Sequence, residues 1–303
     1  MTAALRTLDL DHAGLFVPEM DAAAAALRAM GFTLTPLTPQ RTAPPRPGDP
    51  PAPAGTANRC IMLAGGYIEV LVAEEGADTP VARQLRAALG RHTGLHLIAF
   101  GTADAEAEHR RLDGAGYRPL PVVPLERPVA TAAGGGLARF SVVRVPPATM
   151  AEGRIQFVRQ HTPDLVWQPR FLGHRNRAAA LLEVLLCVAD PDEAAARYAR
   201  FTGRPAAQLA PGHRRLATDR GRLTFMDPPT LGAALPDIAV PALPFMAALT
   251  LASGDLAVTR AVLAAGGVAH RDARSPGTIR VEASPALGAT LLFAGIDAPS
   301  PWG

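Results

Sequence analysis

Three side chains that bind metals or move protons stand in the middle of apolar, strand-like segments of this chain. His12 lies in LDLDHAGLFV, Glu69 in YIEVLV and His96 in LHLIAF. Two imidazoles and one carboxylate are the ligand set of a mononuclear divalent metal that keeps open coordination positions. The sequence therefore predicts a metal site if the fold brings these three side chains together.

Side-chain alternation along the strands favours such a meeting. Successive residues of a strand point to opposite faces of the sheet. In Tyr67–Val72, Ile68, Val70 and Val72 share one face, which leaves Tyr67, Glu69 and Leu71 on the other. By the same count, Leu10, His12, Gly14 and Phe16 share a face of the first strand. A charge in mid-strand costs several kcal/mol if it is buried without a partner, so Glu69 is expected to meet one.

The elements that would position these residues recur along the chain. Residues 8–31 are typical of an apolar strand, an acidic helix start, an alanine-rich helix and a closing glycine. Similar units occur at 94–116, 181–203 and, more faintly, 245–266. Regular spacing of this kind indicates a repeat architecture, and each unit is too short to bury its own sheet face, so units should pair. The predicted fold is α+β, with four tandem βαβββ modules in two domains.

Aligned on their hairpin glycines, the last strands of three modules read GYIEVLV, GRIQFVR and GRLTFMD. Glu69, Gln156 and Thr224 then occupy one column, and aligning the first strands on their helices places His12, His96, Glu183 and about Ala247 in another. If the first two modules pair about a pseudo-twofold axis, His12, Glu69, His96 and Gln156 converge in one cup. Gln156 is then either a fourth, weak oxygen ligand or a hydrogen-bonding partner of the substrate. The alternative for each histidine is a core residue satisfied by a neighbour, and for Glu69 an ordinary ion pair with arginine.

The module pattern gives the domain boundaries. We expect residues 1–160 to form the functional domain with the metal cup, 161–177 to connect, and 178–303 to form a second, degenerate domain that braces the first, closes its cup or mediates a homodimer. The proline-rich segment 39–55 and the segment 125–136 are predicted to be loops, either of which would be placed to cover the cup.

Composition excludes several classes of function. The net charge is +3 and the basic residues are scattered, all of them arginine, so neither a nucleic acid partner nor lysine Schiff-base chemistry is expected. No apolar run is long enough to span a membrane, and Asp9 and Asp11 interrupt the place of a signal-peptide core, so a cytoplasmic protein with a small-molecule partner is expected. Cys60 and Cys187 lie far apart in apolar segments and should be reduced, buried thiols.

Other residues are candidates for contact with a substrate. Asn58 and Arg59 open the strand before Glu69, where an arginine would bind a carboxylate or phosphate through two hydrogen bonds. Tyr67 lies on the face of Glu69. His161 follows the Gln156 strand and is the candidate general base, with a solvent-exposed role as its alternative.

The stretches LDHAGLFVPEMDAAAAALRAMGF, GTANRCIMLAGGYIEVLV and GLHLIAF resemble the glyoxalase-like proteins of the vicinal oxygen chelate superfamily. That group includes glyoxalase I, extradiol dioxygenases and bleomycin-resistance proteins. The resemblance implies paired βαβββ modules whose first and last strands supply metal ligands, here His12, Glu69, His96 and Gln156. Gln156 departs from the glutamate that glyoxalase I uses as its base, and a glutamine cannot abstract a proton.

Two functions follow as hypotheses. The first is a metal-dependent lyase, isomerase or dioxygenase that holds a small oxygenated organic substrate on Fe, Mn, Zn or Ni, an ion that stabilises an enolate-like or oxygen-bound state. The second is a non-catalytic protein that sequesters a small molecule, with His12 and Glu69 as hydrogen-bonding partners and without a metal. A purely structural domain would instead have no pocket.

Overall fold

The computed structural model describes residues 7–42, 52–131, 134–296, 298 and 300–302. Its elements follow the predicted order of four βαβββ modules, which confirms the α+β fold. The first module comprises β1 (Asp9–Phe16), α1 (Met20–Ala29), β2 (Thr38–Thr42), β3 (Ala52–Met62) and β4 (Tyr67–Ala73). After α2 (Pro80–Leu89), the second comprises β5 (Gly94–Gly101), α3 (Ala105–Gly114), β6 (Val123–Thr131), β7 (Gly134–Arg144) and β8 (Arg154–Gln160), with a 3-10 turn at Pro147–Thr149.

The second half repeats this order. A short connection holds α4 (Pro163–Val166) and a 3-10 turn at Pro169–Phe171. The third module comprises β9 (Ala178–Cys187), α5 (Pro191–Thr202), β10 (Ala206–Ala210), β11 (His213–Ala217) and β12 (Arg222–Met226), and it is followed by α6 (Pro228–Ala234). The fourth comprises β13 (Phe245–Ser253), α7 (Leu256–Ala265), β14 (His270–Asp272), β15 (Thr278–Val281) and β16 (Thr290–Gly295).

Local chemistry explains where the module helices begin. Asp104, Asp190 and Asp255 each accept hydrogen bonds from backbone N–H groups in the first turns of α3, α5 and α7. An aspartate at this position satisfies donors that the helix itself leaves free. The predicted glycine that follows the helix is present as well, since Gly31, Gly116 and Gly203 all have positive φ angles, which glycine adopts at little cost.

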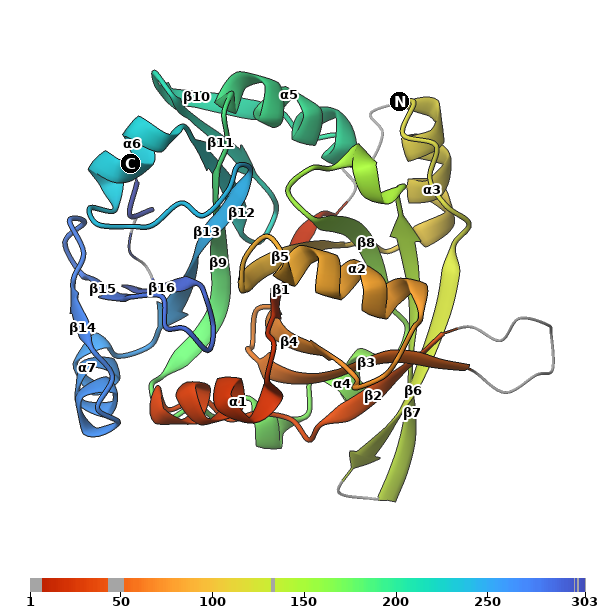
Figure 1. Cartoon of the computed structure of the whole chain (residues 1–303), viewed down its shortest axis with the longest axis horizontal. Helices are drawn as coiled ribbons and strands as arrows, with labels where there is room; N and C mark the ends of the chain where they lie inside the picture. The colour runs from red at the N-terminus through yellow and green to blue at the C-terminus, as the bar shows by residue number, and fades with distance from the viewer. Residues whose placement is uncertain (1–6, 43–51, 132–133, 297, 299, 303) are drawn as a thin grey trace.

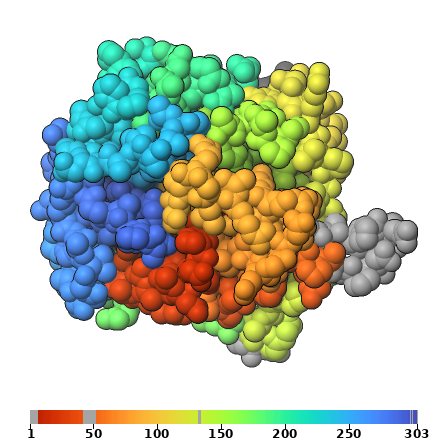
Figure 2. All heavy atoms as spheres, viewed as in Figure 1, coloured from red at the N-terminus to blue at the C-terminus, as the bar shows by residue number. Residues whose placement is uncertain are grey.

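Each pair of modules builds one half of the molecule through its first strands. β1 pairs antiparallel with β5, and β9 with β13, while each first strand also pairs parallel with the last strand of its own module. The two halves are linked by one pair between β5 and β13, Leu95 with Met246, and by two isolated bridges, Asp9 with Arg220 and Gly65 with Ala180. In Figures 1 and 2 the first half, red to yellow-green, lies directly against the blue and teal second half.

One large hydrophobic core lies between the sheets and the helices, and it crosses the boundary between the halves. The ring of Phe201 from α5 stacks on Phe157 of β8 with centroids 5.2 Å apart, and Phe32 lies 6.0 Å from Phe293 of β16. The boundaries of two separate domains therefore remain a prediction. No helix among the described residues is long and apolar enough to cross a membrane.

Two predicted loops are wrong, because they hold long strands at the edges of the sheet. In the proline-rich segment 39–55, residues 39–42 belong to β2 and residues 52–55 belong to β3. Residues 43–51 lie outside the described residues. Of the segment 125–136, residues 125–131 end β6 and 134–136 begin β7, with 132–133 outside the described residues. An edge strand tolerates proline because one side of it makes no ladder hydrogen bonds.

Candidate functional site

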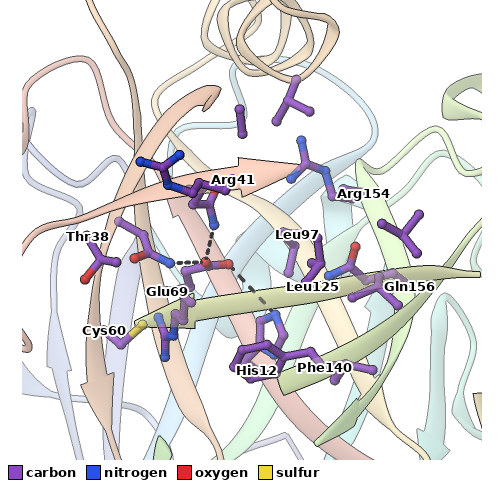
Figure 3. Close-up of a pocket in the computed structure, with 18 of the residues that line it drawn as sticks. His12, Thr38, Arg41, Cys60, Glu69, Leu97, Leu125, Phe140, Arg154 and Gln156 are labelled. Atoms are coloured by element: carbon purple, nitrogen blue, oxygen red, sulfur yellow. Dashed lines mark hydrogen bonds and ion pairs between the residues drawn. The ribbon is translucent and has the colours of Figure 1, made fainter. Parts of the chain in front are cut away.

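A cup opens on the face of the first half that the module helices do not cover. Its cavity volume is about 130 Å³. Its wall carries polar side chains on β1, β2, β3, β4, β6, β7 and β8 and an apolar patch on β5, β6 and β7 (Figure 3). The polar members include His12, Thr38, Gln40, Arg41, Asn58, Tyr67, Glu69, Glu126, Arg127, Arg144, Arg154 and Gln156, and the apolar patch comprises Leu97, Leu125, Phe140 and Val142.

A β-bulge at Asp11 aims His12 into the cup. In the ladder between β1 and β5, Leu10 pairs with Phe100 and His12 with Ala99, so Asp11 is an extra residue in its strand. A bulge changes the alternation of the strand. Simple alternation predicts Leu10 on the same face as His12, but the bulge places Leu10 in the main core instead. The bulge brings Asp11 Oδ1 to 2.6 Å from His12 Nδ1.

The His12 ring is held on its other sides by Tyr67 and Glu69. The Tyr67 ring stacks on the imidazole with centroids 4.3 Å apart. His12 Nε2 faces Glu69 Oε2 at 3.9 Å, which is too long for a hydrogen bond. Figure 3 shows the two groups facing each other across this gap.

Two amides orient the Glu69 carboxylate. Asn58 Nδ2 and Gln40 Nε2 donate to Glu69 Oε1 at 2.5 Å and 3.0 Å. The predicted arginine partner of Glu69 is replaced here by neutral donors. Gln40 escaped the sequence analysis because its segment was predicted to be a loop; the signal would have been the alternation of Thr38 and Gln40 on an edge strand.

His96 does not reach the cup, which corrects the predicted ligand set. Gly14 pairs with Leu97 and Leu15 with Leu95, so His96 is the extra residue of a second bulge. The bulge turns Leu97 into the cup, where it takes the place that corresponds to His12 in the first module. The register confirms this, since the residue two positions after His12 pairs with Glu69 and the residue two positions after Leu97 pairs with Gln156.

His96 is instead a core histidine with one ring nitrogen hydrogen-bonded, while its Nδ1 atom is buried without a partner among the described residues. Its Nε2 atom lies 2.8 Å from the carbonyl oxygen of His92, and its ring stacks on the His92 ring with centroids 4.0 Å apart. Burial lowers the pKa of His96 to about 4, so the ring is neutral at physiological pH. The alternative that the sequence left open for a lone histidine is therefore the correct one at this position.

Two half-buried arginines that the sequence analysis missed line the cup beside Gln156. Arg144 Nε donates to Gln156 Oε1 at 3.2 Å, and Arg154 Nη2 donates to Gln84 Oε1 at 2.7 Å. Neither forms an ion pair with a carboxylate among the described residues. Burial, together with the charge of Arg144, lowers the pKa of Arg154 to about 10, and burial lowers the pKa of Arg144 as well. Arg154 stands two positions before Gln156 in its strand, and that spacing was the available signal.

The remaining predicted residues divide between the cup and other surfaces. Asn58 and Tyr67 line the cup, whereas Arg59, one position along β3, points to the other face and donates to the Thr35 carbonyl oxygen at 2.9 Å. His161 is exposed outside the cup, with Nε2 2.7 Å from Ser141 Oγ, so it is not placed to act as the base there. Cys60 lines the cup as a free thiol, and burial raises its pKa to about 11, which keeps it protonated.

The residues of the cup do not fit the predicted metal. One imidazole, His12, lines the cup with the carboxylates of Glu69 and Glu126, and Glu126 is paired with Arg139. Leu97 offers no ligand atom, and the Gln156 oxygen already accepts from a guanidinium that repels cations. Within the described ranges, no three histidine, cysteine, aspartate or glutamate side chains are grouped so that they would hold a metal ion.

The part of the second half that corresponds to the His12 and Glu69 wall is filled, whereas Phe245, Ala247 and Thr290 line an open hollow elsewhere in this half. Glu183 and Thr224 occupy the positions of His12 and Glu69, and they are hydrogen-bonded to each other. Arg222 forms an ion pair with Glu183 at 3.1 Å. Leu231 and Leu235, in and just after α6, pack with Trp302 over the apolar part of this face. The chemistry of the chain is therefore concentrated in the first half.

Comparison with known proteins agrees with this architecture. A family model described as a glyoxalase-like domain matches residues 10–202. The chain belongs to this family. No curated protein matches it.

Solved structures share the fold of this glyoxalase-like chain at low sequence identity. A hypothetical protein from Staphylococcus aureus has a TM-score of 0.66 at 11% identity, and the alignment covers 95% of this chain and 100% of that one. A mutant of 4-hydroxymandelate synthase from Streptomyces coelicolor has a TM-score of 0.54 at 17% identity, covering 98% and 96%. A fusion of a xylose isomerase-like TIM barrel with 4-hydroxyphenylpyruvate dioxygenase has a TM-score of 0.53 at 13% identity, covering 98% of this chain and 50% of the fusion.

Proposed function

We propose that the cup binds a small organic acid without a metal, with the acid group against Arg144 and Arg154 and the apolar body over Leu97, Leu125 and Phe140. The observation that carries this proposal is the pair of half-buried guanidiniums that form no ion pair with a carboxylate among the described residues. Keeping such charges partly buried is costly, and an anionic ligand would offset that cost through charge-assisted hydrogen bonds.

The rest of the wall suits the same ligand. The apolar patch on β5, β6 and β7 would accept an aromatic or branched body, because such surface gains free energy when it leaves water. Asn58 Oδ1 is buried and has no hydrogen-bond partner among the described side chains and backbone groups, so it is available to a hydroxyl or amide of the ligand. This arrangement favours the second of the two functions expected from the sequence.

The metal-dependent enzyme expected from the family resemblance needs a second imidazole in the cup. The bulge at His96 removes it and places Leu97 there. The donor atoms of the wall therefore support recognition of an anion better than chelation of a substrate on a metal. Superfamily membership itself specifies no reaction, since function depends on the residues of the site.

Calorimetric titration with phenylpyruvate tests this proposal, because that molecule joins a carboxylate to an aromatic ring. The names of the structural neighbours refer to aromatic hydroxy and oxo acids, so 4-hydroxyphenylpyruvate is a second probe. We expect both acids to bind, and phenylacetone, which keeps the ketone and lacks the carboxylate, to bind at least about tenfold more weakly, a difference of ~1.4 kcal/mol.

Arg154→Met should weaken binding of phenylpyruvate by about tenfold or more, since it removes one of the two half-buried charges. Arg260→Met is the matched control, because Arg260 is exposed and pairs with Asp272 in the second half, outside the cup. Equal binding of phenylacetone, or unchanged binding by both Arg154→Met and Arg144→Met, would show that the cup does not recognise the anion.

A further inference from the structure

The most strongly constrained group in the cup is the imidazole of His12, and nothing in anion binding alone requires it. Asp11 Oδ1 lies 2.6 Å from its Nδ1, and the amide of Gln160 donates to the same Asp11 oxygen at 3.2 Å. A carboxylate at this distance accepts the Nδ1 proton, which fixes the tautomer and leaves the lone pair of neutral histidine on Nε2. Asp11 therefore acts as a positioning residue.

The lone pair of Nε2 points into the open part of the cup. The stack with Tyr67 at 4.3 Å fixes the plane of the ring, and the facing oxygen of Glu69 lies 3.9 Å away. This separation is longer than a hydrogen bond, and His12 and Glu69 both line the cup, so Nε2 lies beside the space that a bound molecule would occupy. The His12 ring is held in place by Asp11 and Tyr67, and its Nε2 atom makes no hydrogen bond among the described residues. This arrangement meets the geometric requirement for general base catalysis.

The charges around this base suit the formation of an enolate. Arg144 and Arg154 are preorganised positive groups on the same wall, and groups of this kind stabilise negative charge that develops on a carboxylate or carbonyl oxygen. Cys60 does not compete as a nucleophile, because its thiol is protonated at neutral pH.

We propose that the cup is the active site of a metal-free proton-transfer enzyme, in which His12 Nε2 removes a proton from the carbon next to the carbonyl of a bound 2-oxo acid. The inference depends on the proposed binding of organic acids. The C–H bond breaks and its electron pair becomes the carbon–carbon double bond of the enolate, while an N–H bond forms on His12. The proton then returns either to the carbon, which gives exchange with solvent, or to the oxygen, which gives the enol tautomer, so no oxidant or co-reactant is consumed.

Deuterium exchange of phenylpyruvate at C3, followed by proton NMR in D2O, tests this inference with the full chain. We expect the protein to accelerate exchange over buffer, and His12→Gln to lose about 100-fold or more of that acceleration, in line with the usual contribution of a general base. His161→Gln is the matched control, since this exposed histidine lies outside the cup, and it should exchange at the rate of the unmodified chain.

Binding of phenylpyruvate is measured on the same samples and separates the two proposals. Asp11→Asn should slow exchange while the dissociation constant changes by less than about twofold, because Asp11 acts through the ring of His12 rather than on the ligand. Tight binding with exchange at the buffer rate, or full exchange by a folded His12→Gln variant, would overturn the proton-transfer inference alone. Loss of binding in the unmodified chain would overturn the proposed function as well.

Discussion

At the scale of single residues, Leu97 decides what the cup is able to bind. It stands where the paired architecture would place the second imidazole, two positions before the partner of Gln156. A leucine at that position leaves His12 as the one histidine that lines the cup among the described residues, and it extends the apolar patch formed with Leu125 and Phe140. The same exchange therefore removes a ligand atom and adds surface for the body of an organic molecule.

Restoring the ligand atoms should restore a metal site. The variant Leu97→His with Gln156→Glu would offer two imidazoles and two carboxylates, a set that binds Zn²⁺. After dialysis against zinc and then against buffer, we expect about one zinc per chain by elemental analysis, against well below one for the unmodified chain.

Adding His12→Ala to that variant is the control, and it should lose most of the bound zinc. Stoichiometric zinc in the unmodified chain that disappears in His96→Ala would instead show that His96 is a ligand after all.

At the scale of elements, two β-bulges explain which predictions from the sequence succeed. The alternation in β4 is regular, so the placement of Tyr67 and Glu69 in the cup is predicted correctly. In β5 one extra residue inverts the alternation beyond it, and His96 is assigned to the wrong face. The residue types of β5 do not predict this bulge, because the bulge depends on how β5 pairs with β1. Arg144 is missed for a related reason, since its strand continues from a segment predicted to be a loop.

The bulge residue His96 should give the protein a specific sensitivity to acid. Its pKa is about 4 in the folded chain, against about 6.5 when unfolded. Between these values only the unfolded state takes up the proton, so stability from this group is complete above about pH 6.5 and falls as the pH is lowered toward 4. At pH 5 the loss amounts to ~2 kcal/mol relative to pH 7.

Urea unfolding at pH 7 and pH 5 measures this effect. His96→Gln should lose less stability than the unmodified chain between the two pH values by ~1–2 kcal/mol, although it is less stable at pH 7. His161→Gln, which changes an exposed ring, should keep the full dependence. An unchanged pH dependence in His96→Gln would mean that the buried ring is protonated in the folded state.

At the scale of the whole molecule, the second half completes the core of the first. The continuous core between the halves includes Phe157 and Phe201, which stack across the boundary, and it resembles the interior of one domain more than an interface between two. The face around Glu183 is filled by its own hydrogen bond and ion pair, and the open hollow of the second half lies instead beside Phe245, Ala247 and Thr290. Its predicted part in bracing the first half agrees with these contacts, while closing the cup and forming a homodimer remain predictions.

A shared core predicts one cooperative unfolding transition. Trp167 packs beside the cup and Trp302 packs under α6 in the second half, so Trp302→Phe and Trp167→Phe leave one reporter in each half. We expect the two fluorescence midpoints in urea to agree within about 0.2 M with each other and with circular dichroism, as in two-state unfolding. Separate midpoints would support the two domains predicted at 1–160 and 178–303.

The bulges at Asp11 and His96 also affect how relatives of this chain are to be compared. Each bulge inserts one residue, Asp11 or His96, just before the residue that faces the cup, which is His12 or Leu97. A histidine that faces the cup and a histidine in the bulge are therefore only one residue apart along the strand. An alignment that matches His12 with His96 by spacing counts two imidazoles where the folded molecule presents one. In each of the first two modules, the residue that faces the cup lies two positions before the partner of Glu69 or Gln156 in the last strand. Sorting the family by the residue type at that position would separate metal-binding members from metal-free ones.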